Sequence, residues 1–129
     1  GDLLVDAEII DRRDFDLGSF ITTKTTSTEA FDFDKLDLPV TIRPRRPADR
    51  FHPLGLKKRG ADPSFSPPSK KVGKFLTDQK VPRYLREKVL VIEDSRSIIW
   101  LYPLRICQQA AIDHNTRKIL KIRISQNAT

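Results

Sequence analysis

Short apolar stretches divided by polar turns run through most of the chain, and they predict strands more often than helices. Apolar residues either alternate with polar ones or form runs of about four to eight residues, and both patterns are typical of strands. The pattern predicts strands at residues 3–10, 15–21, 29–34, 38–43, 89–92, 98–102, 104–109 and 117–124. The stretch 22–28 contains only Thr, Lys and Ser and indicates an exposed loop or hairpin tip.

Two stretches carry helical spacing instead. Residues 70–77 place their apolar side chains at i, i+3 and i+4, on one face of a helix. These side chains are Val72, Phe75 and Leu76. Ser69 is the predicted N-cap of this helix, because its hydroxyl can accept a bond from a free backbone N–H. Pro82 fits the first position of a second short helix at 83–88, where no N–H is needed.

Charge is distributed unevenly along the 129 residues, whose formal net charge is +7. Residues 1–42 hold 4 basic and 10 acidic side chains, a net charge of −6, and residues 43–129 hold 20 and 7, a net charge of +13. Residues 43–88 alone carry +10, from 14 basic and 4 acidic side chains. Such a block attracts polyanions, with nucleic acid the first expectation and an anionic membrane surface the second. A merely solvated basic surface is the alternative.

Composition excludes several classes of protein. The single cysteine, Cys107, allows no internal disulfide and no cysteine-based zinc or iron–sulfur site, and one reduced thiol fits a cytoplasmic location. No apolar run approaches about 18 residues, so we expect no membrane span. The acidic start lacks the features of a signal peptide. Because the sequence contains no methionine, we expect it to be a piece of a longer protein.

The usual catalytic patterns are weak. The five glycines are scattered and form no phosphate-binding loop, and His52 and His114 lack neighbouring ligands at metal spacing. An acidic run near the start could bind a catalytic metal ion, although a solvated strand and loop is the more frequent meaning of such a run. Its members are Asp6, Glu8, Asp11, Asp14 and Asp16. A metal-dependent hydrolase is therefore an open alternative.

The basic segment is poor in aromatic residues. Within residues 43–88 the aromatic side chains are Phe51, Phe65, Phe75 and Tyr84. Base stacking along a single strand needs a row of exposed aromatic rings, whereas a duplex is recognised through its phosphates and shape. The composition therefore favours structured RNA held through its backbone.

Three runs of residues occur in a characteristic order. The first is Phe31-Asp32-x-Asp34-x-Leu36-x-x-Pro39-Val40-x-x-Arg43-x-Arg45-Arg46-x-x-Asp49-Arg50-Phe51-x-Pro53-x-Gly55. The second is Lys70-Lys71-Val72-x-Lys74-Phe75-Leu76-x-Asp78-x-Lys80-Val81-Pro82-x-x-x-Arg86. The third comprises Val89-Leu90-Val91, Ile98-Ile99-Trp100-Leu101 and Leu104-Arg105-Ile106. Together they resemble the C-terminal region of bacterial tRNA(Ile)-lysidine synthetases. This chain departs from the family at Ala48 and Pro103, where glycine is usual.

The resemblance implies a fold and an organisation. The family fold is α+β, with β-sandwich-like sheets and two short helices, and it is similar to a domain of the phenylalanyl-tRNA synthetase β chain. The order of strands and helices predicted above agrees with it. The resemblance covers residues 29–124, which would form the tRNA-binding domain. Residues 1–28 would be an N-terminal β segment and residues 125–129 a tail.

The resemblance also implies a function. Enzymes of this family are ATP-dependent ligases that attach lysine to the wobble cytidine of an isoleucine tRNA, in the cytoplasm. Their chemistry belongs to an N-terminal PP-loop domain with a Ser-Gly-Gly-x-Asp-Ser motif, which this sequence lacks. We therefore expect a non-catalytic part without a cofactor of its own, which binds the tRNA acceptor stem beside its own catalytic domain. Binding energy from this remote contact would help to orient the anticodon.

The candidate tRNA-binding residues are the cations of the matched runs and of the loop between them. They are Arg43, Arg45, Arg46, Arg50, Lys57, Lys58, Lys70, Lys71, Lys74, Lys80, Arg83, Arg86 and Arg105. We expect Asp49 and Asp78 to orient neighbouring cations rather than to contact RNA. For Arg86 and Arg105, which adjoin apolar runs, an internal ion pair is equally open.

A protein-interaction module is the competing interpretation. The acidic and basic halves of the chain could pair with those of a second copy, which would make a homodimer, or the basic face could bind an acidic partner.

Overall fold

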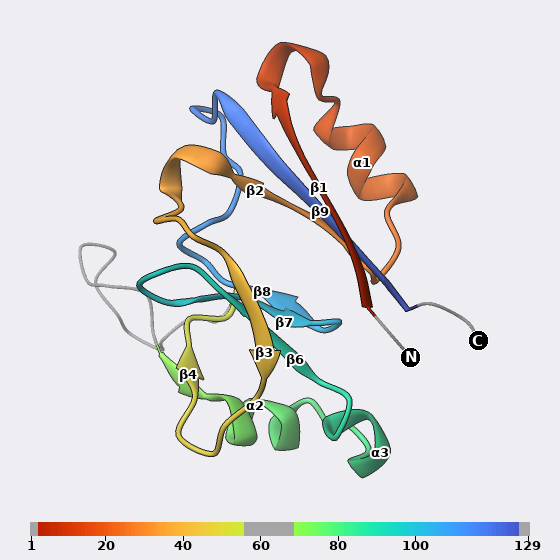
Figure 1. Ribbon diagram of the computed structural model, residues 1–129, viewed down its shortest axis with the longest axis vertical. Helices are drawn as coiled ribbons and strands as arrows, with labels where there is room; N and C mark the ends of the chain where they lie inside the picture. The colour runs from red at the N-terminus through yellow and green to blue at the C-terminus, as the bar shows by residue number, and fades with distance from the viewer. Residues whose placement is uncertain (1–2, 56–68, 127–129) are drawn as a thin grey trace. The chain divides into compact units, whose positions relative to one another are not determined.

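The computed structural model describes residues 3–55 and 69–126, and the chain divides into two units (Figure 1). The first unit combines Gly1–Leu36 with Ala110–Thr129, and the second is Asp37–Gln109. This division differs from the boundaries expected at 28/29 and 124/125, because strands from the two ends of the chain pair with each other.

The first unit contains a three-stranded antiparallel sheet in the order β1-β9-β2. Its strands are β1 (Leu3–Asp11), β2 (Thr28–Asp32) and β9 (Lys118–Gln126). Central β9 supplies buried isoleucine and leucine side chains, and β1 is an edge strand. Three acids of β1 lie opposite three bases of β9, which favours this register. The pairs are Asp6–Arg123, Glu8–Lys121 and Asp11–Lys118.

The strand expected at 15–21 is wrong, because a helix forms there. After a 3-10 turn at Arg12–Asp14, helix α1 (Leu17–Thr23) begins where the Asp16 carboxylate accepts the backbone N–H of Ser19 at 3.1 Å. The N-cap bond satisfies an N–H that a helix leaves free, and it outweighs the strand-like alternation. The predicted loop therefore loses Thr22 and Thr23 to the helix.

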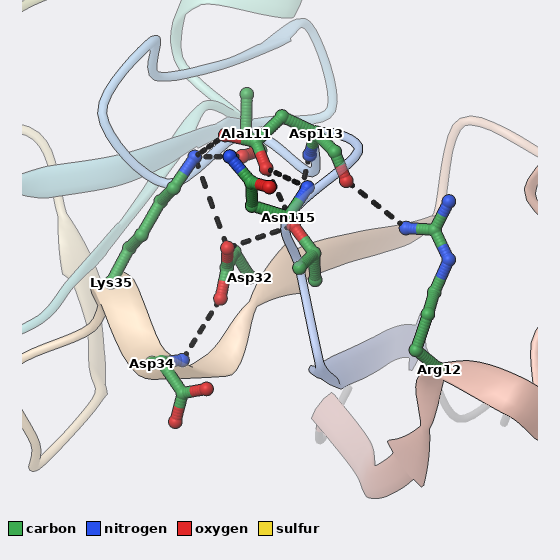
Figure 2. A network of polar contacts seen from close by, with 8 residues as sticks. Arg12, Asp32, Asp34, Lys35, Ala111, Asp113 and Asn115 are labelled. Atoms are coloured by element: carbon green, nitrogen blue, oxygen red, sulfur yellow. Dashed lines mark hydrogen bonds and ion pairs between the residues drawn. The ribbon is translucent and has the colours of Figure 1, made fainter.

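A polar network joins the two ends of the chain within the first unit (Figure 2). The buried Asp32 ends β2, and its carboxylate accepts the Thr116 hydroxyl at 2.8 Å. The Thr116 oxygen in turn accepts the backbone N–H of Asp113 at 2.9 Å. Lys35, in the 3-10 turn Phe33–Lys35, donates to Asp113 at 2.8 Å and to the Ala111 carbonyl at 2.8 Å. Figure 2 shows the Lys35 side chain reaching toward Asp32 and the Ala111 carbonyl.

Replacing Thr116 with valine tests this network. The change removes the hydroxyl from a buried site and leaves the Asp32 carboxylate and the Asp113 N–H without that partner. We expect the free energy of unfolding, measured by urea denaturation, to fall by about 1–3 kcal/mol. Thr116→Ser keeps both hydrogen bonds and should lose less. Equal stabilities of the two variants would contradict a role for the hydroxyl.

The second unit is built on a four-stranded antiparallel sheet in the order β3-β6-β7-β8. Its strands are β3 (Thr41–Pro44), β6 (Leu90–Glu93), β7 (Ile98–Tyr102) and β8 (Arg105–Ile106). The expected strands in these regions are confirmed, with boundaries shifted by a few residues. The central pair β6 and β7 carries much of the core, including the fully buried Val91, Ile92, Ile99, Trp100 and Leu101.

A two-stranded sheet and two helices complete the second unit. The strands are β4 (Arg50–Phe51) and β5 (Lys70–Lys71), and the helices are α2 (Val72–Asp78) and α3 (Arg83–Arg86). The apolar face expected for the first helix is confirmed, since Val72, Phe75 and Leu76 are all buried. The Phe51 and Phe75 rings pack edge to face at 5.1 Å.

The expected N-cap of α2 is wrong. Lys71 occupies the cap position without a side-chain bond, while the Ser69 hydroxyl accepts from Arg50 Nε at 3.1 Å. The reason is the β4–β5 pairing, in which residues 70 and 71 lie opposite 51 and 50, so that the helix begins after the strand. Pro82 is the N-cap of α3 rather than its first helical residue.

Two backbone hydrogen bonds close the C-terminal end of α2. The Val81 N–H donates to the Leu76 carbonyl and the Lys80 N–H donates to the Thr77 carbonyl, both at 3.0 Å. This is a Schellman motif, in which the residue with left-handed backbone is usually glycine. Here that residue is Lys80, with φ of +55°, and in 3–55 and 69–126 no other non-glycine residue has a positive φ. Ala48 therefore needs no glycine-like backbone in this chain.

The expected α+β class is confirmed, with antiparallel sheets and short helices. The helices number three rather than two over the described residues, because α1 was missed. None of the helices described is long and apolar enough to cross a membrane.

Candidate nucleic-acid interface

Arg43 lies at the centre of an ion-paired cluster that ties three segments of the second unit together. Its guanidinium donates to Asp49 through two nitrogens, at 2.8 and 3.0 Å, and to Glu93 of β6 at 2.9 Å. It also donates to the Pro44 carbonyl at 3.0 Å. The side chains of Arg43 and Asp49 are only 15% and 9% exposed. This candidate RNA-binding arginine is therefore engaged inside the fold.

Asp49 connects this cluster to α2. Its carboxylate accepts the backbone N–H of Arg46 at 2.6 Å, and its carbonyl accepts the backbone N–H of Val72, the first residue of α2, at 2.9 Å. The hydrogen bond from the Arg43 guanidinium is the largest cause that lowers the pKa of Asp49 below its usual value, and partial burial opposes it. The expectation that Asp49 orients a neighbouring cation agrees with this geometry.

Five cations gather around the start of α2, and we call them the basic cluster. They are Arg45, Arg46, Arg50, Lys71 and Lys74. Two come from the loop after β3, one each from β4 and β5, and the last from α2 itself. Arg45 Nη1 lies beside the first turn of the helix, where a methyl group added at Gly73 would be 3.9 Å away. All but the half-buried Arg45 are exposed.

The acids near the basic cluster in the described part of the chain form their ion pairs with cations outside it. Asp49 is occupied by Arg43, and Asp78 forms an ion pair with Lys70. None of the five cluster side chains has an ion pair with a described residue. Arg50 and Lys71 even lie directly opposite each other in the β4–β5 ladder, an arrangement that like charges disfavour. An anionic ligand would relieve this repulsion.

Three other candidate cations are held by the fold. Lys70 pairs with Asp78, as expected for that acid. Arg86 Nε donates to the Val81 carbonyl at 2.7 Å, and Arg105 Nη1 donates to the Leu54 carbonyl at 3.0 Å. The Arg105 guanidinium also lies 5.3 Å from the centre of the Phe75 ring. The internal ion pair left open for these two arginines is not found among the described residues, because their partners are neutral: carbonyl oxygens, the Thr77 hydroxyl and the Gln79 side-chain amide.

The remaining candidates differ in position. Lys80 is exposed in the loop before α3, and Arg83 is exposed on α3. Neither belongs to the ion-paired cluster around Arg43. Lys57 and Lys58 lie outside the described residues. No sequence pattern separates the engaged cations from the free ones, because their partners include backbone carbonyls and the distant Glu93.

The acidic run near the start has local partners. Asp6 pairs with Arg123 at 2.9 Å, Asp11 pairs with Arg13 at 3.2 Å, and Asp16 caps α1. Among the residues that the structure describes, no group of three or more His, Cys, Asp or Glu is arranged to hold a metal ion. The arrangement therefore gives no support to the metal-dependent hydrolase.

Solved structures share this fold. A crystal structure of the TilS C-terminal domain aligns with 98% of this chain and 86% of its own, with a TM-score of 0.67 at 17% identity. An N-terminal fragment of the phenylalanyl-tRNA synthetase β-subunit from Pyrococcus horikoshii aligns with 78% of this chain and 28% of its own, with a TM-score of 0.61 at 16% identity. The chain therefore has the fold of a TilS C-terminal domain.

Sequence comparison gives the family. Residues 40–124 match the family described as the TilS substrate C-terminal domain. A tRNA(Ile)-lysidine synthase of Caldanaerobacter subterraneus subsp. tengcongensis is 30% identical over 123 residues, 95% of this chain. One of Clostridium tetani is 35% identical over 104 residues, 81% of this chain. The chain belongs to the TilS C-terminal domain family, and it spans 22% and 20% of the length of these two relatives.

Asp49→Asn tests the cluster around Arg43. We expect the free energy of unfolding at pH 7 to fall by roughly 1–3 kcal/mol, because a largely buried guanidinium loses one of its two charged partners and keeps only Glu93. The lowered pKa of Asp49 means that this stabilisation is present above its unfolded pKa of about 4. It is lost as the pH falls through the lower folded-state pKa. The difference in the free energy of unfolding between wild type and Asp49→Asn should therefore shrink below about pH 4.

Glu87→Gln is the matched control for this experiment. Glu87 and its partner Arg83 are 72% and 93% exposed, and their charges are 3.8 Å apart. Such a surface pair contributes about 0–1 kcal/mol. A loss in Asp49→Asn no larger than in this control would show that the Arg43 cluster does not stabilise the fold.

Proposed function

We propose that this chain binds the acceptor stem of an isoleucine tRNA through the basic cluster, as the C-terminal domain of a tRNA(Ile)-lysidine synthase. The observation that carries the proposal is the cluster itself: five cations from four segments, none of them ion-paired with a described residue, are brought together at one end of α2. Family membership supports it, since the curated relatives are tRNA(Ile)-lysidine synthases. The fold shared with a fragment of a tRNA synthetase subunit agrees with it.

The proposed binding mode is contact with phosphates. Lysine and arginine side chains on an exposed, rigid framework neutralise phosphates and release counterions, whatever the base sequence. The framework is rigid here because the carbonyl of Asp49 holds the start of α2 while its carboxylate holds Arg43. The aromatic residues of β4 and α2, Phe51 and Phe75, are buried and offer bases no ring to stack on, so a duplex stem fits the cluster better than an extended single strand.

The larger enzyme would supply the chemistry. In the proposal, a separate catalytic domain uses ATP to join lysine to the wobble cytidine, in the cytoplasm. The acceptor stem lies far from the anticodon and does not react. The binding energy of contacts with it would help to orient the reacting base in the catalytic domain. The partners of this chain would then be the tRNA and its own catalytic domain.

Salt-dependent binding tests the proposal. We expect the 129-residue chain to bind an isoleucine tRNA, and a hairpin that contains only its acceptor stem, with an affinity that falls steeply as salt rises. Five or six phosphate contacts predict a slope of log affinity against log salt of roughly −4 to −5. Fluorescence anisotropy measures both. Absent or salt-independent binding to both RNAs would overturn the proposal.

Charge removal locates the interface. We expect the triple variant Arg45→Gln, Lys71→Gln, Lys74→Gln to weaken binding and to make the salt slope shallower by roughly three, about one for each lost contact. A control variant with the same change of charge alters three exposed cations of the first unit. It is Arg13→Gln, Arg117→Gln, Lys118→Gln. Equal losses in the two variants would indicate general attraction rather than binding at the basic cluster.

Self-association is a second candidate function. Edge strand β1 exposes several large apolar side chains, which is unusual for a strand of a stable monomer. They are Leu3, Leu4, Val5 and Ile9. Sedimentation at two salt concentrations discriminates, since a monomer at both excludes a homodimer.

A further inference from the structure

Tyr84 is an exposed aromatic side chain on a firmly held support. It is 64% exposed, and it lies on α3, where no residue is buried. The support is fixed at both sides: the Val81 N–H bonds to the Leu76 carbonyl, and Arg86 Nε bonds back to the Val81 carbonyl at 2.7 Å. Val81 itself is buried in the core with Phe75 and Leu76. Among the described residues, no other aromatic ring packs against Tyr84.

Lys80, four residues before Tyr84, has a backbone conformation that lysine disfavours. Its φ of +55° places it in the left-handed region, at the position of a Schellman motif where glycine is usual. Its side chain is exposed and has no ion pair with a described residue, and it is the backbone hydrogen bonds of the motif that hold this conformation. A strained, exposed cation of this kind points to a role for the charge outside the fold.

The surroundings of Tyr84 are positively charged. Arg83 is 93% exposed and is only loosely paired with Glu87, at 3.8 Å. Lys80 precedes it and Lys88 follows it, and both are exposed. Figure 1 places α2 and α3 at the same end of the second unit. An aromatic face beside phosphate-binding cations is the arrangement that holds an unpaired nucleotide, with its base on the ring and its phosphate on the cations.

We propose that Lys80, Arg83 and Tyr84 form a subsite for one unpaired nucleotide next to the duplex held by the basic cluster. The base stacks on Tyr84, and Lys80 and Arg83 contact the adjoining phosphates. This inference rests on the proposed binding of an RNA stem. A single aromatic ring suits one nucleotide rather than a long single strand, which agrees with the scarcity of aromatic residues in this segment. The cations favour an anionic occupant, and the exposed ring, on which a flat base can stack, favours RNA over an acidic protein.

Three hairpin RNAs with the same duplex separate stacking from charge. One is blunt, one has a short unpaired 3′ tail, and one has a tail of the same length made of abasic nucleotides, which keep the phosphates but lack the bases. We expect the base-bearing tail to raise the affinity of the 129-residue chain by roughly 5- to 150-fold over the abasic tail, the range that corresponds to one stacked base. Equal affinities for the two tails would overturn the subsite.

Variants at Tyr84 identify the ring. Tyr84→Phe should keep the preference for the base-bearing tail, and Tyr84→Leu, which keeps apolar surface without a ring, should abolish it. Both should bind the blunt hairpin like wild type and unfold at the same temperature, because the side chain is exposed. A preference that survives in Tyr84→Leu contradicts the proposal. Failure of wild type to bind any of the hairpins would instead contradict the proposed function.

Variants at Lys80 test whether this lysine contacts the phosphates of the unpaired tail. Lys80→Gly should raise the unfolding temperature, because glycine adopts the left-handed backbone without strain, and yet weaken binding of both tailed RNAs. Lys80→Asn keeps a residue that tolerates this backbone and removes the charge, so it should weaken the tailed RNAs to a similar degree. The blunt hairpin should be affected least in both. An unchanged affinity for the tailed RNAs in both variants would show that the strained lysine does not bind them.

Discussion

The ion pairs of Arg43 with Asp49 and Glu93 determine how the second unit presents its charge. One guanidinium joins β3, the loop that follows it and β6, and the carbonyl of Asp49 then accepts the first N–H of α2. Without this arrangement the loop that carries two arginines would have no fixed position relative to the helix that carries a lysine. Largely buried ion pairs are weak sources of net stability, but they specify geometry by penalising alternatives that separate the charges. The basic cluster depends on that geometry.

Much of the fold follows from local patterns in the sequence. The alternation of apolar and polar residues located the strands of both sheets, and helical spacing located the buried face of α2. The failures have local causes too. At α1, a capping bond from Asp16 to Ser19 prevailed over strand-like alternation, and at Ser69 a pairing with a distant strand delayed the helix. A capping hydrogen bond can outweigh the spacing of apolar residues. That spacing also cannot show which strand a segment will pair with.

The candidate site was predictable as a segment but not residue by residue. Charge counting located the basic block, yet Arg43 and Glu93 are 50 residues apart in the sequence, and Arg105 bonds to the Leu54 carbonyl 51 residues away. Because of such contacts, cations that the sequence marks as candidates for RNA binding stabilise the fold instead. The same holds for the acidic half of the chain, where part of the charge lies opposite bases of β9. The net charge of a sequence segment therefore overstates the number of charged side chains that are available to bind a ligand, since it counts paired and unpaired side chains alike.

Two features of the second unit conflict with local rules of stability. Arg50 lies opposite Lys71 in a ladder, and Lys80 occupies a backbone position suited to glycine. Each costs stability within the fold, and each exposes a positive charge that no described residue neutralises. In natural proteins, local backbone preference, packing and electrostatics generally favour the same structure, and the exceptions concentrate at functional sites. Both exceptions involve cations, and an RNA bound as proposed would bring phosphates to both at once, because its phosphates repeat along the chain.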